Sequence, residues 1–219
     1  AIAPPPGPIV QSLVISPDGK SVVFPAREAA GTRLWIQQLD SLAADRLPGT
    51  DGASFPFWST KGDRVGFFAG GRLKCLALAT REATDLAAAP EGLGGAWNEQ
   101  GDILFAPDRG APLMRLPAST GVPVPETVLG SEFKEGHAWP HFLPGGRRVL
   151  YTDYSANGEQ YGIYIKDLDT GAVRRLVAVY SSAAYSPDGY LLYVKGFDQL
   201  VAVRLDLDRL EVQGEPVPV

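Results

Sequence analysis

The stretch Tyr185-Ser186-Pro187-Asp188-Gly189, followed by Leu191-Leu192-Tyr193-Val194, decides the fold of this chain. In Ser-Pro-Asp-Gly the proline presets φ, the aspartate hydrogen-bonds nearby backbone groups, and the glycine accepts the left-handed conformation that closes a short hairpin. An aromatic residue therefore precedes a tight turn, and an aliphatic strand follows it.

The same arrangement occurs five times along the 219 residues. The turns span residues 16–19, 59–62, 98–101, 143–146 and 186–189, and their final glycines are 39 to 45 residues apart. The residues just before the turns are apolar, namely Ile15, Trp58, Trp97, Phe142 and Tyr185. A period near 40 that fills the chain predicts a repeat architecture, and the recurring residues are expected to be buried between repeats.

Each repeat holds four strand-like segments. In the fourth repeat an apolar run at 148–151 follows the turn, a third strand lies at 162–165, and the polar turn Asp169-Thr170-Gly171 leads to a fourth at 172–176. Four antiparallel strands in a unit of this length are typical of a β-propeller blade. We therefore expect an all-β protein, a β-propeller of five four-stranded antiparallel blades, either complete or part of a larger propeller.

The domain organisation follows from the repeats. Residues 1–8 are rich in proline and are expected to form an extended linker. Residues 9–219 are expected to form one propeller domain, with repeats at about 9–50, 51–90, 91–135, 136–178 and 179–219.

Each repeat owns all four of its strands, from residues 10–15 at the start to residues 216–219 at the end. No strand is left over to complete a blade across the two ends. We expect either a five-bladed ring closed by side-chain burial or an open ring whose apolar flanks drive self-association into a homo-oligomer, and we favour the open ring.

Composition argues against a nucleic-acid partner, a membrane-spanning helix and a disulfide bond. The net charge is −5, so no basic face is expected to neutralise the phosphates of a nucleic acid. No apolar stretch approaches the ~20 residues that a membrane-spanning helix needs. The single cysteine, Cys75, excludes a disulfide within the chain.

Three further stretches, 46–59, 137–144 and 214–219, occur in order between and after the turn repeats. Together with the repeats they resemble the TolB-like, WD-related propeller repeat of bacteria. The resemblance is closest to the propeller region C-terminal to bacterial serine/threonine protein kinases, and it covers the chain from about Gln11 onward. It implies a non-enzymatic binding or sensor module for a protein or small-molecule ligand, in an extracytoplasmic or periplasmic location. It carries over no binding residues.

Residues that break the repeat pattern are the candidates for a ligand surface. These are the aromatic residues Phe55, Trp139 and Tyr180. His137 and His141 lie on the same predicted inner strand as Trp139, where they pack or line the channel. Four residues of regular strand separate the two histidines by ~13 Å, too far to share one metal ion. We therefore expect no metal site, no cofactor and no catalytic residue.

Two alternative functions stay open. The first is a metal-dependent propeller hydrolase of the lactonase type, although the predicted inner strands are poor in the acids and amides that would hold its metal ion. The second is a structural or self-assembling propeller fragment. A serine hydrolase is disfavoured because the chain contains no Gly-x-Ser-x-Gly sequence.

Overall fold

The computed structural model describes residues 12–130, 136–154, 160–196 and 198–219. These residues form 20 strands and no helix. The strands make five four-stranded antiparallel sheets, and the strands of each sheet follow one another in chain order. The expected five-bladed propeller architecture is thereby confirmed. The expected linker at 1–8 lies outside the described residues. Within the described residues, no helix long and apolar enough to cross a membrane is found.

The five sheets are named blades one to five in chain order. Blade one contains β1 (Val14–Ile15), β2 (Ser21–Glu28), β3 (Gly31–Gln38) and β4 (Ala44–Arg46). Blade two contains β5 (Ser54–Trp58), β6 (Arg64–Ala69), β7 (Arg72–Ala77) and β8 (Glu82–Ala88). Blade three contains β9 (Gly95–Trp97), β10 (Ile103–Phe105), β11 (Met114–Leu116) and β12 (Val124–Pro125). Blade four contains β13 (His137–Phe142), β14 (Arg148–Asp153), β15 (Gly162–Asp167) and β16 (Val173–Val177). Blade five contains β17 (Ala183–Ser186), β18 (Tyr190–Lys195), β19 (Gln199–Asp206) and β20 (Glu211–Pro218). Each blade falls inside one of the five expected repeats.

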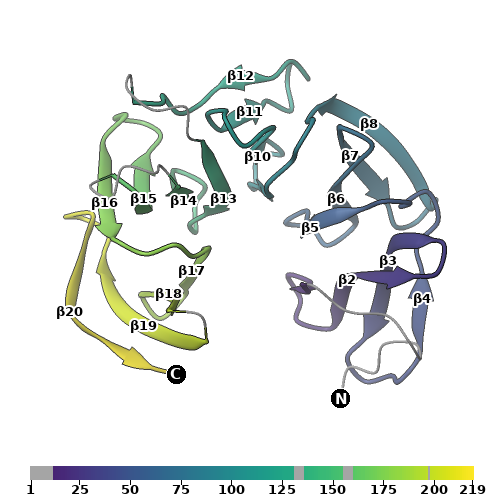
Figure 1. Ribbon diagram of the computed structural model, residues 1–219, viewed down its shortest axis with the longest axis horizontal. Helices are drawn as coiled ribbons and strands as arrows, with labels where there is room; N and C mark the ends of the chain where they lie inside the picture. Colours follow the sequence, from purple (N-terminus) through teal and green to yellow (C-terminus); the bar gives the residue numbers. More distant parts are fainter. Residues whose placement is uncertain (1–11, 131–135, 155–159, 197) are drawn as a thin grey trace.

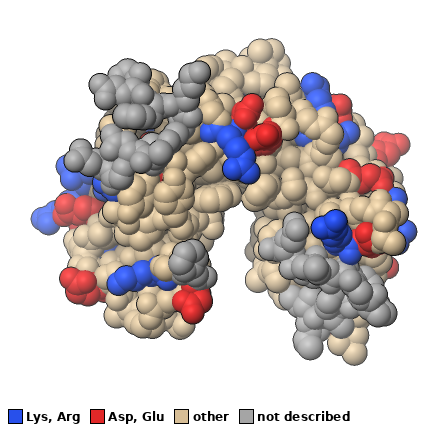
Figure 2. Space-filling view, viewed as in Figure 1, with Lys and Arg blue, Asp and Glu red and all other residues tan. Residues whose placement is uncertain are grey.

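The blades stand side by side around an open arch (Figure 1). The first strand of each blade lies at the inner side of the arch and the fourth strand at the outer side. Neighbouring blades pack on each other, whereas the described strands of blades one and five make no comparable contact. Figure 2 shows that the opening between these two blades persists when side chains are drawn.

The two ends of each blade differ in character. The turns that join first to second strands and third to fourth strands lie at one end, here called the turn face. All five repeated turn glycines have positive φ, between 68° and 90°, as the turn requires. The opposite end, here called the loop face, carries the connections between second and third strands and the connections between blades. Because loops can vary without disturbing the sheets, the loop face is the natural place for a site.

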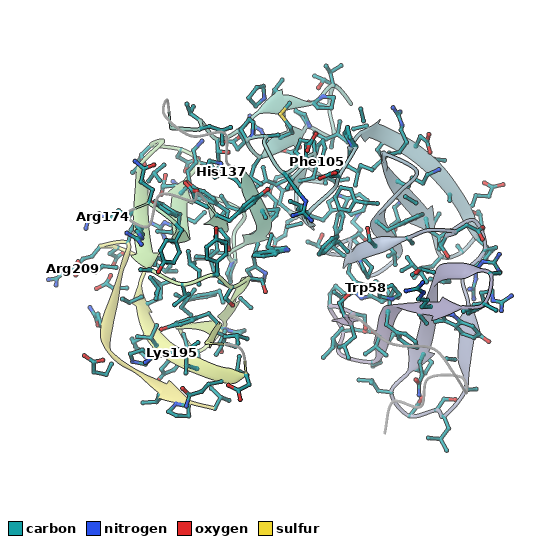
Figure 3. All side chains as sticks on the ribbon, viewed as in Figure 1. Trp58, Phe105, His137, Arg174, Lys195 and Arg209 are labelled. Atoms are coloured by element: carbon teal, nitrogen blue, oxygen red, sulfur yellow. The ribbon has the colours of Figure 1, made fainter. Side chains whose placement is uncertain are left out.

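In blades two to five, the apolar residue before the turn packs against the preceding blade. Trp58 packs on the core cluster between blades one and two, which includes Val23 and Val65, and its Nε1 donates a hydrogen bond to the carbonyl of Val14 at 3.1 Å. Figure 3 labels Trp58 at this first junction. The Trp97 ring lies 6.1 Å from the ring of Phe57 in blade two. Phe142 and Tyr185 pack on blades three and four in the same way. These side chains are half-buried rather than fully buried, since they lie next to the exposed turn.

The second strands show which sheet faces are covered. In β6 and β14 consecutive residues are buried, so both faces of those sheets are covered. In β18 burial alternates, with Leu191 and Tyr193 buried and Leu192 and Val194 only partly so. Blade five therefore has one face that no other blade covers.

The expected end strands were only partly correct. The last strand, expected at 216–219, is the eight-residue β20, which begins at Glu211. A register shift between Ala202 and Arg204 of β19 lets both halves of β20 pair with the same neighbour. The first strand was expected at 10–15. Within the described residues it consists of β1, which is two residues long, and residues 10 and 11 lie outside the described part.

Truncating one pre-turn side chain tests this packing. We expect Trp97→Ala to lower the free energy of unfolding by about 3 kcal/mol, because it removes the ring that packs on Phe57. The matched control is Ile15→Ala, since Ile15 holds the same repeat position but is 56% exposed. That change should cost less than about 0.5 kcal/mol. Urea unfolding measures both, and equal losses would contradict this view of the junctions.

Candidate ligand site on the loop face

A pocket of about 310 Å³ opens on the loop face between blades two and three. Phe55 and Phe68 of blade two form one side, and Gly92 and Leu93 from the connection into blade three form another. Arg109, from the loop between β10 and β11, lies at its edge. The pocket thus combines aromatic side chains, glycine backbone and one cationic side chain, the mixture that small-ligand sites commonly use.

Two aromatic residues near this pocket have unusual backbone conformations. Phe55 has φ of 46° and Trp139 has φ of 50°, and each directly precedes a proline. Both lie where an inner strand loses regular pairing with its neighbour, in β5 and in β13. A bulky residue at positive φ costs roughly 1–3 kcal/mol, and such residues cluster at functional sites. A bulge also redirects a side chain away from the regular sheet pattern.

The two strained residues lie against the start of blade three. Phe55 lines the pocket and is 36% exposed. The backbone N–H of Trp139 donates to the carbonyl of Leu93 at 2.9 Å. A Cβ on Gly94 would lie 3.2 Å from both Cα and Cδ1 of Trp139, so a glycine at this position lets blade four approach closely. Trp139 therefore supports the backbone that forms the pocket wall.

Four side chains form a connected rim across blades two to five, defined here as Glu91, Arg109, Tyr154 and Tyr180. The carboxylate of Glu91 lies 3.1 Å from Nε of Arg109, and both side chains are largely exposed. The Tyr154 hydroxyl donates to the carbonyl of Arg109, and the Tyr180 hydroxyl donates to the carbonyl of Tyr154 at 2.6 Å. In Figure 2, basic and acidic side chains lie together at the inner edge of the arch on this face.

Other residues contact the rim from beneath and from the side. A Cβ on Gly136 would lie 2.0 Å from the carbonyl oxygen of Arg109, so the two chain segments touch at backbone distance. The Tyr180 ring stacks on Tyr161 with centroids 5.3 Å apart, and the guanidinium of Arg175 lies 5.4 Å from the Tyr161 ring. Tyr180 is nevertheless 55% exposed, which leaves part of its ring accessible to a ligand.

His137 lies inside the junction of blades three and four, as Figure 3 shows. It is only 3% exposed. Its Nδ1 lies 2.7 Å from the Thr127 hydroxyl, and its Nε2 lies 3.5 Å from the Asp153 carboxylate. Its backbone N–H donates to the carbonyl of Ala111. Of the two roles expected from sequence, the structure places His137 in packing, directly below the loop that carries Arg109.

His141 lies toward the turn face, in a second pocket of about 310 Å³ that Trp97 and Tyr185 also line. Its Nε2 accepts the backbone N–H of Tyr185 at 3.4 Å, across the junction with blade five. Burial lowers the pKa of His141, so the ring is neutral at pH 7. The five candidate residues thus separate. Phe55, Trp139 and Tyr180 belong to the loop face, His137 lies beneath it, and His141 lies apart.

Sequence reasoning missed Glu91, Arg109 and Tyr154. Their partners are far away along the chain, and no local pattern marks them. Within the described residues, no three His, Cys, Asp or Glu side chains gather in an arrangement that could hold a metal ion.

No protein family model matches the chain, and no curated protein matches it. Solved structures do resemble it. TolB from Acinetobacter baumannii matches with a TM-score of 0.76 and 18% identity, over 92% of this chain and 52% of that one. An oligogalacturonate lyase in complex with manganese matches with a TM-score of 0.65 and 18% identity, over 91% and 62%.

The extracellular domain of a putative one-component system from B. thetaiotaomicron matches with a TM-score of 0.65 and 14% identity, over 93% of this chain and 27% of that one. The chain therefore spans about half of the TolB structure and under two thirds of the lyase. At these identities the likeness establishes a TolB-like propeller fold and no more. The neighbours include both enzymes and a domain named as extracellular.

The raised pKa values of tyrosines at the site and in the nearby core predict that the folded protein loses stability at alkaline pH. Burial is the main cause that raises the pKa of Tyr154 to about 12, and it also raises the pKa values of Tyr151 and Tyr164. An unfolded tyrosine titrates near pH 10. Because the folded pKa values are the higher ones, stability should be complete below about pH 10 and fall as the pH rises toward 12.

Urea unfolding between about pH 8 and pH 12 measures this dependence. In Tyr154→Phe the decline should be shallower, because one titrating phenol is gone. At pH 8 the same variant should be less stable by about 1 kcal/mol, because the carbonyl of Arg109 loses its donor. A parent protein whose unfolding midpoint stays level up to pH 12 would contradict the prediction.

Proposed function

We propose that this chain is a non-enzymatic binding module that holds a ligand or a protein partner on its loop face. One observation carries the proposal: two aromatic residues, Phe55 and Trp139, are kept in costly left-handed conformations on either side of one pocket wall. Strain of this kind persists only where the surrounding structure imposes it, and it clusters at functional sites.

The chemistry of the site favours binding over turnover. Arg109 is paired with Glu91, and the Tyr154 hydroxyl with its raised pKa is a hydrogen-bond donor rather than a base at neutral pH. A partner would stack an apolar or ring surface on Phe55 and Tyr180. It would place its polar groups toward Arg109 and Glu91.

We further propose that the chain is the extracytoplasmic part of a bacterial signalling protein, of the kind in which a propeller follows a serine/threonine kinase. Its turn repeats and the stretches at 46–59, 137–144 and 214–219 support this proposal. The TolB neighbour and the extracellular domain among the solved structures are consistent with such a location.

A metal-dependent propeller enzyme is the alternative, and the observation that favours it is the manganese-bound lyase among the structural neighbours. Elemental analysis of purified protein separates the two. A stoichiometric divalent ion, with turnover that is lost on its removal, would favour the enzyme.

The binding proposal is tested by Phe55→Asn. Asparagine tolerates positive φ better than phenylalanine does, so the change removes the ring and relieves backbone strain. We expect the variant to be at least as stable as the parent. We also expect it to bind about tenfold more weakly any compound that raises the parent's melting temperature in a panel of peptides and saccharides.

The matched control is Arg81→Asn. Arg81 has φ of 59° and lies at the turn between β7 and β8, so it shares the backbone conformation but lies on the turn face. The Arg81→Asn variant should bind the same compounds as the parent protein, with the same affinity. Equal binding by the Phe55 variant, or equal loss in the control, would refute the assignment of the site.

A further inference from the structure

The turn face has hollows between the turns of neighbouring blades. One of about 220 Å³ lies between blades one and two, and one of about 270 Å³ lies between blades two and three. Another, of about 310 Å³, contains His141 and lies between the turns of blades three and four, where Tyr185 of blade five also lines it. This last hollow is called the turn-face pocket. Because the repeat itself produces such hollows, their side chains decide what each of them can bind.

The turn-face pocket differs from the other two hollows in charge. Lys61 lines both of the others, and Arg64 also lines the one between blades two and three. None of the described residues around the turn-face pocket is a lysine or an arginine. Its acidic residue is Glu99, which is exposed. His141 adds no charge at pH 7, because burial lowers its pKa. The pocket is therefore negative at neutral pH, which favours a cation.

Three aromatic residues line the same pocket, namely Trp97, Phe142 and Tyr185. Each is half-buried, so part of its surface remains accessible. The Trp97 ring is held in place, since its Nε1 donates to the carbonyl of Gly101 at 3.0 Å and the ring of Phe57 lies 6.1 Å away. Phe142 packs on the core between blades three and four. Because packing fixes these rings without a ligand, binding would cost little ordering of side chains.

Two polar side chains of the pocket provide hydrogen-bond donors. Asn98 is only 7% exposed, and its Oδ1 accepts the backbone N–H of Asp102 at 2.8 Å. Its amide nitrogen has no hydrogen-bond partner among the described residues. In His141, Nε2 accepts the backbone N–H of Tyr185, so the proton of the neutral ring is on Nδ1. Both residues line the pocket, so a ligand there can offer an oxygen to these two N–H groups.

We infer that the turn-face pocket binds a small organic ammonium ion, a ligand separate from that of the loop face. Its alkylated nitrogen would lie against the aromatic rings and Glu99, because a cation is attracted to the face of an aromatic ring. A hydroxyl or carbonyl oxygen of the ligand would accept from Asn98 and His141. A volume of about 310 Å³ is at the small end of ligand pockets, which matches a ligand of this size.

A pair of compounds of the same shape tests the inference. Choline is the probe, and 3,3-dimethyl-1-butanol, in which carbon replaces the charged nitrogen, is its uncharged control. Each is titrated into the 219-residue chain at constant ionic strength, and NMR follows the assigned indole N–H signals of the four tryptophans. The Trp97 signal should shift and saturate with a dissociation constant of about 1 mM. The uncharged compound should bind roughly tenfold more weakly or not at all, because it lacks the attraction of a cation to the rings.

Two variants should weaken choline binding. Glu99→Gln removes the charge and should raise the dissociation constant about fivefold at low salt. Tyr185→Leu keeps an apolar side chain but removes the ring, and should raise it about tenfold. The matched control is Glu82→Gln, the same change in net charge at an exposed residue of β8, and it should bind choline as the parent does. Phe55→Asn should also bind choline normally, which separates this pocket from the loop-face site.

Circular dichroism and urea midpoints verify that the variants fold. If Tyr185→Leu does not fold, Glu99→Gln still decides the question, because Glu99 is exposed at a turn. Three results would overturn the inference. One is the absence of a saturable shift of the Trp97 signal up to about 20 mM choline. Another is equal binding of the uncharged compound, which would mark the pocket as merely apolar. The third is a Glu82→Gln variant that weakens binding as much as Glu99→Gln does.

Discussion

A blade of this protein is a sheet with two apolar faces, and the structure depends on covering both. A single four-stranded sheet cannot do so alone, because its faces point in opposite directions. The next blade supplies the cover, and in blades two to five the half-buried residue before the turn packs in the contact. Trp58 shows the principle most fully, since it packs on blade one and also donates to the Val14 carbonyl. The arch, its curvature around the inner strands and the separation of two faces follow from repeating this contact.

Much of the fold is visible in the sequence because turns are local. The residue that ends each turn adopts positive φ, and glycine adopts it most readily. Five such glycines at regular spacing therefore predict five blades from sequence alone. Strand ends are less predictable. The early start of β20 depends on a register shift opposite Ala202, which is a property of a pair of strands and of no single segment.

The candidate site was only partly predictable for the same reason. Tyr180 breaks the repeat pattern, whereas Phe55 and Trp139 share one repeat position, three residues before Trp58 and Phe142. His137 and His141 lie on one short strand, β13, whose pairing with β14 is irregular. His137 lies in the core between blades three and four, whereas His141 lies toward the turn face. The Tyr154 hydroxyl donates to the backbone carbonyl of Arg109, which lies 45 residues earlier in the chain. No local sequence pattern predicts such a contact. Two aromatic-proline pairs, Phe55-Pro56 and Trp139-Pro140, were the one available sign of the strained positions.

The strictly serial order of strands has a consequence for how the chain comes to its structure. Among the described residues, every sheet is built from one continuous segment of 31 to 41 residues, and no strand comes from a distant part of the chain. Each strand therefore pairs with a strand next to it in sequence, which keeps the loops that must close within a blade short. As the polypeptide leaves the ribosome, each blade can pair its strands as soon as its fourth strand emerges, and the previous blade already presents a face for it. Assembly can then proceed in the direction of synthesis, one blade after another.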